Sequence, residues 1–197
     1  MKRIVIMADG KGIRWDSYMG IPKHLASVRG EKLISRTVRI LRERTRTAEI
    51  LVTSHDPRYE FEGSTRYEPM NNVYEIDRFT EELIMDDMCF LYGDTFYTEM
   101  TLERIIKEKV EDILFFGNDK SIVAIKIMDS NVFRKHMLRV KKMYLDGKLD
   151  KCTGWQVYCS FTGQNLEGPV EKKKSFIFTD QGTFDVNTPD DYKEIEK

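Results

Sequence analysis

The residue types best suited to bind phosphate follow the first apolar run of the sequence. Gly10 and Gly12 flank Lys11 directly after residues 4–8, which read Ile-Val-Ile-Met-Ala. A glycine-rich loop at the end of a buried strand lets backbone N–H groups approach phosphate oxygens that a Cβ atom would obstruct. The loop is not the dinucleotide-binding motif G-x-G-x-x-G, because Trp15 occupies the position of the third glycine. It is not a Walker A loop either, because no G-K-[ST] occurs. An ordinary turn is the alternative interpretation.

Two cations close to this loop favour a polyphosphate ligand. Arg14 and Lys23 both fall within the first 23 residues. A guanidinium can bind two phosphate oxygens at once, and an ammonium adds a compact point charge beside them. The alternative is that both are ordinary surface charges, as most lysines and arginines are.

Asp94 is the first candidate for a metal ligand. It follows Gly93 at the end of an uninterrupted apolar run, residues 88–92. In doubly wound sheets, ligands bind beyond the carboxyl ends of the strands, where a carboxylate is well situated to hold a cation. The alternative is an Asp that forms a turn or caps a helix.

A second group of oxygen ligands lies near the C-terminus. Residues 188–191 read Thr-Pro-Asp-Asp, with a good N-cap, a proline at N1 and an acid at N3, and a helix start explains them without any function. It does not explain Asp185 and Asn187. These two are two positions apart on a predicted strand, so their side chains point to the same face.

Histidine and cysteine suggest no competing chemistry. The three histidines form no H-x-x-x-H pair, and the three cysteines have no C-x-x-C spacing. A histidine-ligated metal, a structural zinc site and a disulfide framework are therefore not indicated. We expect packed thiols, and we expect oxygen atoms to hold any metal.

The elements that position these groups alternate between short buried runs and amphipathic stretches. Strands are predicted at residues 4–8, 50–53, 88–92, 113–116, 122–127, 175–180 and 182–186, and helices at residues 32–44, 76–83, 102–110, 131–145 and from residue 189. Residues 58–72 have no clear period. The pattern predicts a single α/β domain over residues 1–197, with three α/β/α layers and a mostly parallel mixed sheet.

Composition excludes several classes of protein. Hydrophobic residues make up 41% of the 197 residues, charged residues 33%, and the net charge is −1. Such a chain can bury one core, and it has no bulk charge with which to bind nucleic acid or a membrane surface. No apolar run approaches the length of a signal peptide core or a transmembrane helix. We expect a cytoplasmic protein without nucleic-acid or membrane partners.

The order of the motifs resembles the nucleotidyltransferases with a glycosyltransferase-A-like, nucleotide-diphospho-sugar transferase fold. The motifs are G-x-G-x-R, P-K-x-L with a following G-x-x-L-I, G-D after a buried strand, and D-x-[DN]-T-P-[DE]-D, spread from Ile4 to Tyr192. The family includes sugar-phosphate, phosphocholine and molybdenum-cofactor nucleotidyltransferases. Residues 71–74, Asn-Asn-Val-Tyr, are similar to a segment of the phosphocholine-type cytidylyltransferases.

The resemblance implies a role for each matching residue. The nucleotide would be bound by Ala8, Gly10, Lys11, Gly12, Arg14 and Asn72, the catalytic cations would be Arg14 and Lys23, and Mg²⁺ would be held by Asp94, Asp185 and Asn187. Lys23 would neutralise charge at the reacting α-phosphate. This sequence departs from the family at two positions: Asp9 replaces a small alanine, and Asn187 replaces the commoner aspartate.

The implied activity is transfer of a nucleoside monophosphate from a nucleoside triphosphate, with CTP favoured, to a sugar phosphate or a phosphocholine-like acceptor, with release of pyrophosphate. Cations and Mg²⁺ must neutralise two reacting anions, and no protein nucleophile is required. A glycosyltransferase using a nucleotide sugar is an alternative, although its D-x-D motif would need an acid at Phe96. A non-catalytic nucleotide-binding module is another. The base, the acceptor, the number of metals and the choice between monomer and homodimer are left open.

Overall fold

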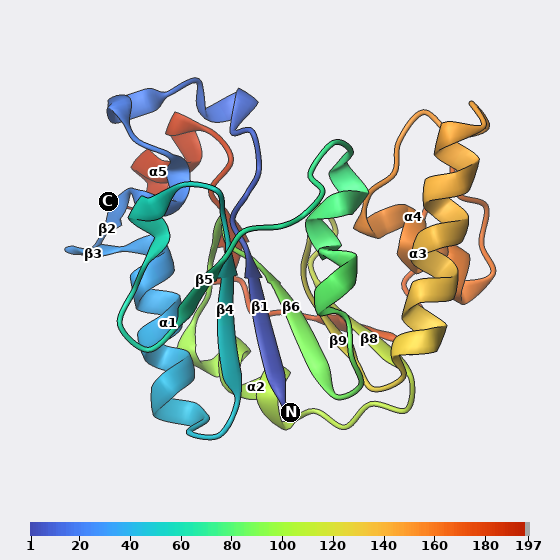
Figure 1. Cartoon of the computed structure of the whole chain (residues 1–197), viewed down its shortest axis with the longest axis horizontal. Coiled ribbons are helices and arrows are strands. Elements are labelled where there is room, and N and C mark those ends of the chain that lie inside the picture. The colour runs from blue at the N-terminus through green and yellow to red at the C-terminus, as the bar shows by residue number, and fades with distance from the viewer. Residues whose placement is uncertain (196–197) are drawn as a thin grey trace.

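A seven-stranded sheet forms the centre of the computed structural model, which describes residues 1–195 (Figure 1). In the order β10-β8-β9-β6-β1-β4-β5, the strands are Phe176–Phe178, Ile113–Gly117, Ile122–Ile127, Met88–Tyr92, Arg3–Met7, Glu49–Thr53 and Thr65–Tyr67. Strand β9 is antiparallel to both of its neighbours, and every other adjacent pair is parallel. The predicted mostly parallel mixed sheet is confirmed.

Helices cover both faces of this sheet. On one face lie α1 (Leu33–Arg44) and α2 (Glu99–Lys107), and on the other lie α3 (Ser130–Leu145) and α4 (Gly154–Thr162) (Figure 1). The side chains of neighbouring residues in β1 point to opposite faces of the sheet. Ile6 packs in the apolar cluster with α1 and α2, and Val5 packs in the cluster with α3 and α4. This alternation is what a strand buried on both faces requires.

One helix prediction is wrong, and one helix was not predicted. The helix expected at residues 76–83 consists of two 3-10 turns, η5 (Glu75–Phe79) and η6 (Glu81–Leu83), because Thr80 takes a left-handed conformation with φ of 35° between them. Helix α4 begins with a capping box between Thr153 and Gln156. Strand β5 falls in the stretch where the sequence has no clear period.

Smaller elements close the end of the sheet where the candidate residues lie. They are the β2–β3 hairpin (Ser27–Val28 and Glu31–Lys32), the β7–β11 pair (Thr95–Phe96 and Phe184–Asp185), helix α5 (Pro189–Ile195), and the 3-10 turns η1 (Ile13–Trp15), η2 (Tyr18–Gly20), η3 (Lys23–Leu25) and η4 (Pro57–Tyr59). A third apolar cluster, which includes Trp15, Phe96 and Tyr192, packs the hairpin, the β7–β11 pair, α5 and the turns η1 and η2 together. It joins the loop after β1 to the C-terminal segment.

No helix within residues 1–195 combines the length and the apolar character needed to span a bilayer. The three cysteines are buried and free, in agreement with the packed thiols predicted from their spacing.

Candidate active site

The ends of β1 and β6 lie against each other and bring two of the predicted motifs together. The N–H of Gly93 donates to the Met7 carbonyl oxygen over 2.9 Å. A Cβ atom at position 93 would lie 2.7 Å from that oxygen, which is closer than any side chain tolerates. Glycine is therefore required here, and the close approach places Asp94 beside the loop that follows β1.

The loop after β1 is shaped by one glycine and anchored by one tryptophan. Gly12 has φ of 60°, in the left-handed region that glycine adopts without strain, and its carbonyl oxygen accepts from the Trp15 N–H over 3.0 Å. The indole of Trp15 is buried, donates Nε1–H to the Ile21 carbonyl oxygen over 2.7 Å and packs edge-on against Tyr192. Trp15 therefore helps to fix the conformation of the loop.

Four predicted residues meet in one polar network beside this loop. Lys23 Nζ forms an ion pair with Asp94 Oδ2 and donates to Asn187 Oδ1 over 3.1 Å. Arg14 Nη2 donates to the same Asn187 oxygen over 2.8 Å. The side chains of Lys23 and Asp94 are only 10% and 14% exposed, so their charges interact with little screening by water.

The position of Asn187 is set by the helix start that follows it. Asp191 Oδ2 accepts from the backbone N–H groups of Asn187 and Thr188 over 3.0 and 2.8 Å, and the Asp191 N–H donates to Thr188 Oγ1 over 3.2 Å. The predicted capping motif is thus present, and it holds the backbone from which Asn187 reaches Lys23.

Asp185 lies on β11 beside this network. Its Oδ1 accepts from Thr95 Oγ1 over 3.1 Å. Burial, together with repulsion from Asp94, raises the pKa of Asp185 to about 6. Burial would also raise the pKa of Asp94, but the ammonium of Lys23 more than offsets this and holds it below its usual value. The two carboxylates are close enough to repel each other.

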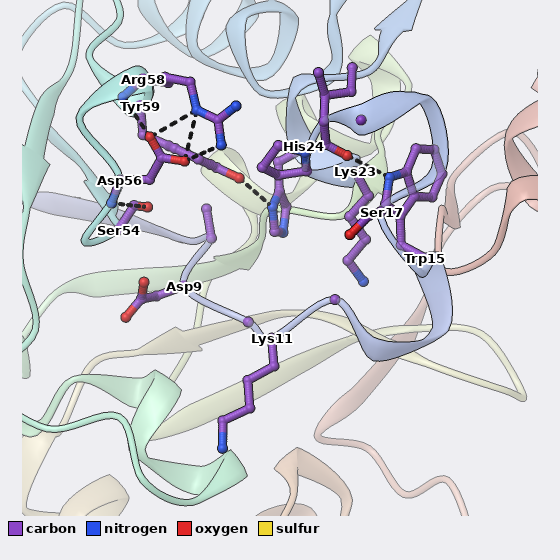
Figure 2. A pocket seen from close by; sticks show the side chains of 16 residues that line it. Asp9, Lys11, Trp15, Ser17, Lys23, His24, Ser54, Asp56, Arg58 and Tyr59 are labelled. Atoms are coloured by element: carbon purple, nitrogen blue, oxygen red, sulfur yellow. Dashed lines mark hydrogen bonds and ion pairs between the residues drawn. The ribbon is translucent and has the colours of Figure 1, made fainter.

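Two cavities share the loop as a wall. Their volumes are about 320 and 390 Å³, and both are lined by Gly10, Lys11, Gly12 and Lys23. The smaller cavity, called here the β4-side cavity, extends to residues after β4 (Figure 2). The larger, called here the η5-side cavity, extends to Asn72 and to residues of η5, and includes Asp94.

The β4-side cavity contains a buried histidine. His24 Nδ1 is hydrogen-bonded to the Tyr59 hydroxyl at 2.9 Å, and burial lowers the pKa of His24 to about 4 (Figure 2). Ala8, which was predicted to bind the nucleotide, is buried directly after β1. Its N–H donates to the Thr53 carbonyl oxygen over 3.2 Å. Lys11 extends away from Lys23 and His24 in Figure 2.

The η5-side cavity contains an arginine that the sequence analysis missed. The Arg78 guanidinium packs against the loop, where a Cβ atom on Gly10 would lie 3.4 Å from Nη2, and it pairs with Glu75 at 3.8 Å. With Lys11, Arg14 and Lys23, it gives this cavity four cations. Its position four residues after Tyr74, close to the segment similar to the cytidylyltransferases, was the available signal in the sequence. The expected helix, with Ile76 and Phe79 on its apolar face, would instead point Arg78 to solvent.

The donor atoms near Asp94 fit a hard divalent cation. Within residues 1–195, no three His, Cys, Asp or Glu side chains are arranged to hold a metal. The predicted ligands are instead two carboxylates, Asp94 and Asp185, and the amide oxygen of Asn187, which are the oxygen donors that Mg²⁺ prefers. Burial and, after it, repulsion from Asp94 raise the pKa of Asp185, and a bound cation would offset that repulsion.

The fold is the glycosyltransferase-A-like fold of solved nucleotidyltransferases. Solved structures that match it over nearly the whole chain include the following three. A CTP:phosphocholine cytidylyltransferase from Streptococcus pneumoniae has a TM-score of 0.61 at 14% identity, over 99% of this chain and 97% of its own. A UTP-bound UGPase from Acinetobacter baumannii has a TM-score of 0.66 at 12% identity, over 100% and 92%.

The third is a 4-diphosphocytidyl-2C-methyl-D-erythritol synthase from Anaerococcus prevotii, with a TM-score of 0.61 at 12% identity, over 100% and 94%. No family model and no curated protein matches the sequence. Users of CTP and of UTP thus share the fold, so the fold by itself does not select a nucleotide.

Proposed function

We propose that the chain, as one domain, is a Mg²⁺-dependent nucleotidyltransferase that transfers a nucleoside monophosphate from a nucleoside triphosphate to a phosphorylated small molecule such as a sugar phosphate. One observation carries the proposal: the Lys23 ammonium lies between Asp94 and Asn187 at the wall of the η5-side cavity. The likeness of the fold to nucleotidyltransferases over nearly the full length supports it.

The reaction joins two anions, and the cations of the cavity suit it. A phosphate oxygen of the acceptor attacks the α-phosphorus, a new P–O bond forms, and the bond to the β-phosphate oxygen breaks to release pyrophosphate. The attacking oxygen is already ionised, so no general base is needed. Lys23, Arg14 and Arg78 offset the negative charge that otherwise keeps the reactants apart.

Asp94, Asp185 and Asn187 would hold the Mg²⁺ ion. A bound Mg²⁺ supplies charge neutralisation at the phosphates and helps to orient them. In the chain itself, Lys23 contacts two of these three ligands, so one ammonium orients the ligand set and also lies next to the reacting groups.

The residue two positions after Asp94 argues against the glycosyltransferase alternative. Phe96 is buried in the third apolar cluster, with its ring 5.8 Å from that of Phe184. An apolar side chain at this place cannot supply the second acid of a D-x-D motif.

The test is to incubate the protein with each nucleoside triphosphate, Mg²⁺ and a panel of phosphorylated small molecules, and to measure pyrophosphate. We expect release that depends on both the acceptor and the metal. Full activity in excess EDTA would contradict the metal assignment. Nucleotide binding without product on any acceptor would identify a non-catalytic module instead.

A further inference from the structure

Asp9, one of the two departures from the family pattern, joins three loops near the site. Its Oδ1 accepts from the His55 backbone N–H over 3.1 Å. Its Oδ2 accepts from His55 Nδ1 over 2.8 Å and from Asn72 Nδ2 over 2.7 Å. Asn72 Nδ2 also donates to the main-chain oxygen of Asp9 over 2.7 Å. The residue therefore connects the ends of β1 and β4 to the segment before η5.

These contacts fix which way the Asn72 carboxamide points. Both atoms of Asp9 that receive Nδ2, a carboxylate oxygen and a carbonyl oxygen, can only accept hydrogen bonds. Only the NH₂ group of an amide can donate twice, so the nitrogen must face Asp9 and the oxygen must face elsewhere. Asp9 thus occupies both donors of Asn72.

The remaining atom, Asn72 Oδ1, is free to accept. It has no hydrogen-bond partner within residues 1–195, and no buried side-chain oxygen or nitrogen there lacks a partner, so Oδ1 is accessible to solvent. Asn72 lines the η5-side cavity, together with the cations Lys23, Arg14 and Arg78. The cavity therefore offers cations that can bind phosphates. At Asn72 it also offers a hydrogen-bond acceptor, Oδ1, whose neighbouring NH₂ group is already bound to Asp9.

We propose that Asp9, by fixing the Asn72 carboxamide, makes Asn72 an acceptor-only reader of the nucleobase, and that the site thereby selects a base with an exocyclic amine over the matching base with an exocyclic oxygen. An amine completes a hydrogen bond with Oδ1. A carbonyl oxygen at the same place faces another acceptor and loses its hydrogen bond to water. This inference rests on the proposed function in one respect, that the nucleotide binds in the η5-side cavity, and it does not depend on the transfer reaction.

Two pairs of nucleotides isolate this difference. CTP and UTP differ at position 4 of the pyrimidine, and ATP and ITP differ at position 6 of the purine, in each case by an amine against an oxygen on a ring of the same size. The experiment is equilibrium binding of each nucleotide in the presence of Mg²⁺, measured by calorimetry, without an acceptor. We expect the amine form to bind about tenfold or more tightly in the pair that fits the cavity.

Three variants assign the effect. Asn72→Ala removes the acceptor and should bring the ratio of the two affinities close to one. Asp9→Ala should lower the ratio part of the way, because the main-chain oxygen of residue 9 still holds the amide through one bond. His55→Ala is the matched control: His55 contacts Asp9 but not Asn72, so the ratio should stay as in the wild type.

Equal binding within both pairs in the wild type overturns the inference, as does an unchanged ratio in Asn72→Ala or the absence of binding by all four nucleotides. The wild-type ratio is decisive even where a variant does not fold. Selective binding without pyrophosphate release on any acceptor would refute the proposed function and leave this inference standing. Pyrophosphate release without a preference for the amine form of the base would support the proposed function and refute this inference.

Discussion

Lys23 and Asn187 lie 164 positions apart in the sequence, and Lys23 Nζ donates to Asn187 Oδ1 over 3.1 Å. Apolar packing makes this contact possible. Trp15, from the loop before Lys23, packs edge-on against Tyr192 of α5 with ring centroids 5.8 Å apart. A small hydrophobic cluster outside the main core therefore aligns the polar network. A substitution in this cluster should alter the hydrogen bonds of Lys23.

Asp94→Asn should reduce turnover more than stability. The change keeps the shape of the side chain but removes the charge that pairs with Lys23, and loss of one preorganised electrostatic contact costs about a hundred- to a thousand-fold in kcat. Because Lys23 is buried, the free energy of unfolding should also fall by roughly 1–3 kcal/mol. The measurements are kcat and chemical denaturation on one preparation.

Asp180→Asn is the control for Asp94→Asn. Asp180 accepts hydrogen bonds from Thr98 and Thr101 at the start of α2, away from the network around Lys23. The Asp180→Asn protein should be less stable than the wild type and should have the same kcat. An Asp94→Asn protein with unchanged kcat would remove Asp94 from the metal site.

Asn187→Asp should lower the Mg²⁺ concentration that gives half-maximal activity. The change adds a carboxylate to the proposed ligand set while keeping the acceptor for Lys23 and Arg14. Asn187→Leu, of similar size, removes the oxygen and should abolish pyrophosphate release. A metal titration identical in Asn187→Asp and wild type would show that position 187 does not touch the ion.

Arg78→Gln should weaken nucleotide binding, because it removes one of four cations from the η5-side cavity. We expect kcat/KM to fall by about ten- to a hundredfold, in line with one charge-assisted hydrogen bond. Arg104→Gln, on the exposed side of α2, changes the same residue type outside the cavity and should leave kcat/KM unchanged. Equal losses in the two variants would argue for a general effect of net charge.

His24 should make the fold less stable in mild acid. Its folded pKa of about 4 lies below the unfolded value of 6.5, so between these values the unfolded chain takes up a proton that the folded chain excludes. The stability from a neutral His24 is fully present above pH 6.5 and is lost as the pH falls towards 4, by about 3 kcal/mol.

His24→Gln removes this titration, so the difference in unfolding free energy between wild type and variant should shrink as the pH falls. Urea denaturation of both proteins at several pH values measures it. Contributions of other groups, Asp185 among them, cancel in the comparison. Parallel curves for the two proteins would mean that His24 titrates normally.

Six of the seven strands of the main sheet, and the Gly-Asp motif of the proposed metal site, were predictable because they depend on local patterns. Residues 88–92 form an uninterrupted apolar run, and a Gly-Asp pair after such a run lies at the carboxyl end of a strand wherever the sheet is parallel. The Thr-Pro-Asp-Asp cap was predictable for the same reason, since its hydrogen bonds link residues 187–191.

Other features depend on contacts that no periodicity records. The apolar spacing of Ile76, Phe79 and Leu83 fits a helix, but the backbone of Thr80 breaks it into two turns. That break belongs to the segment that places Arg78 against Gly10. Likewise, nothing in the sequence pairs Asp9 with Asn72, because β5 pairs with β4 and the segment after β5 must return to the end of β1 to make the contact.

The distance in sequence between Lys23 and Asn187 also sets an order of events during synthesis. All seven strands of the main sheet are complete by Phe178, before the ribosome adds Asp185 and Asn187. A chain released early, or clipped between these points, keeps every strand of that sheet and lacks part of the proposed metal site. The polar network around Lys23 is therefore completed only after the main sheet, when the segment that carries Asn187 has been made.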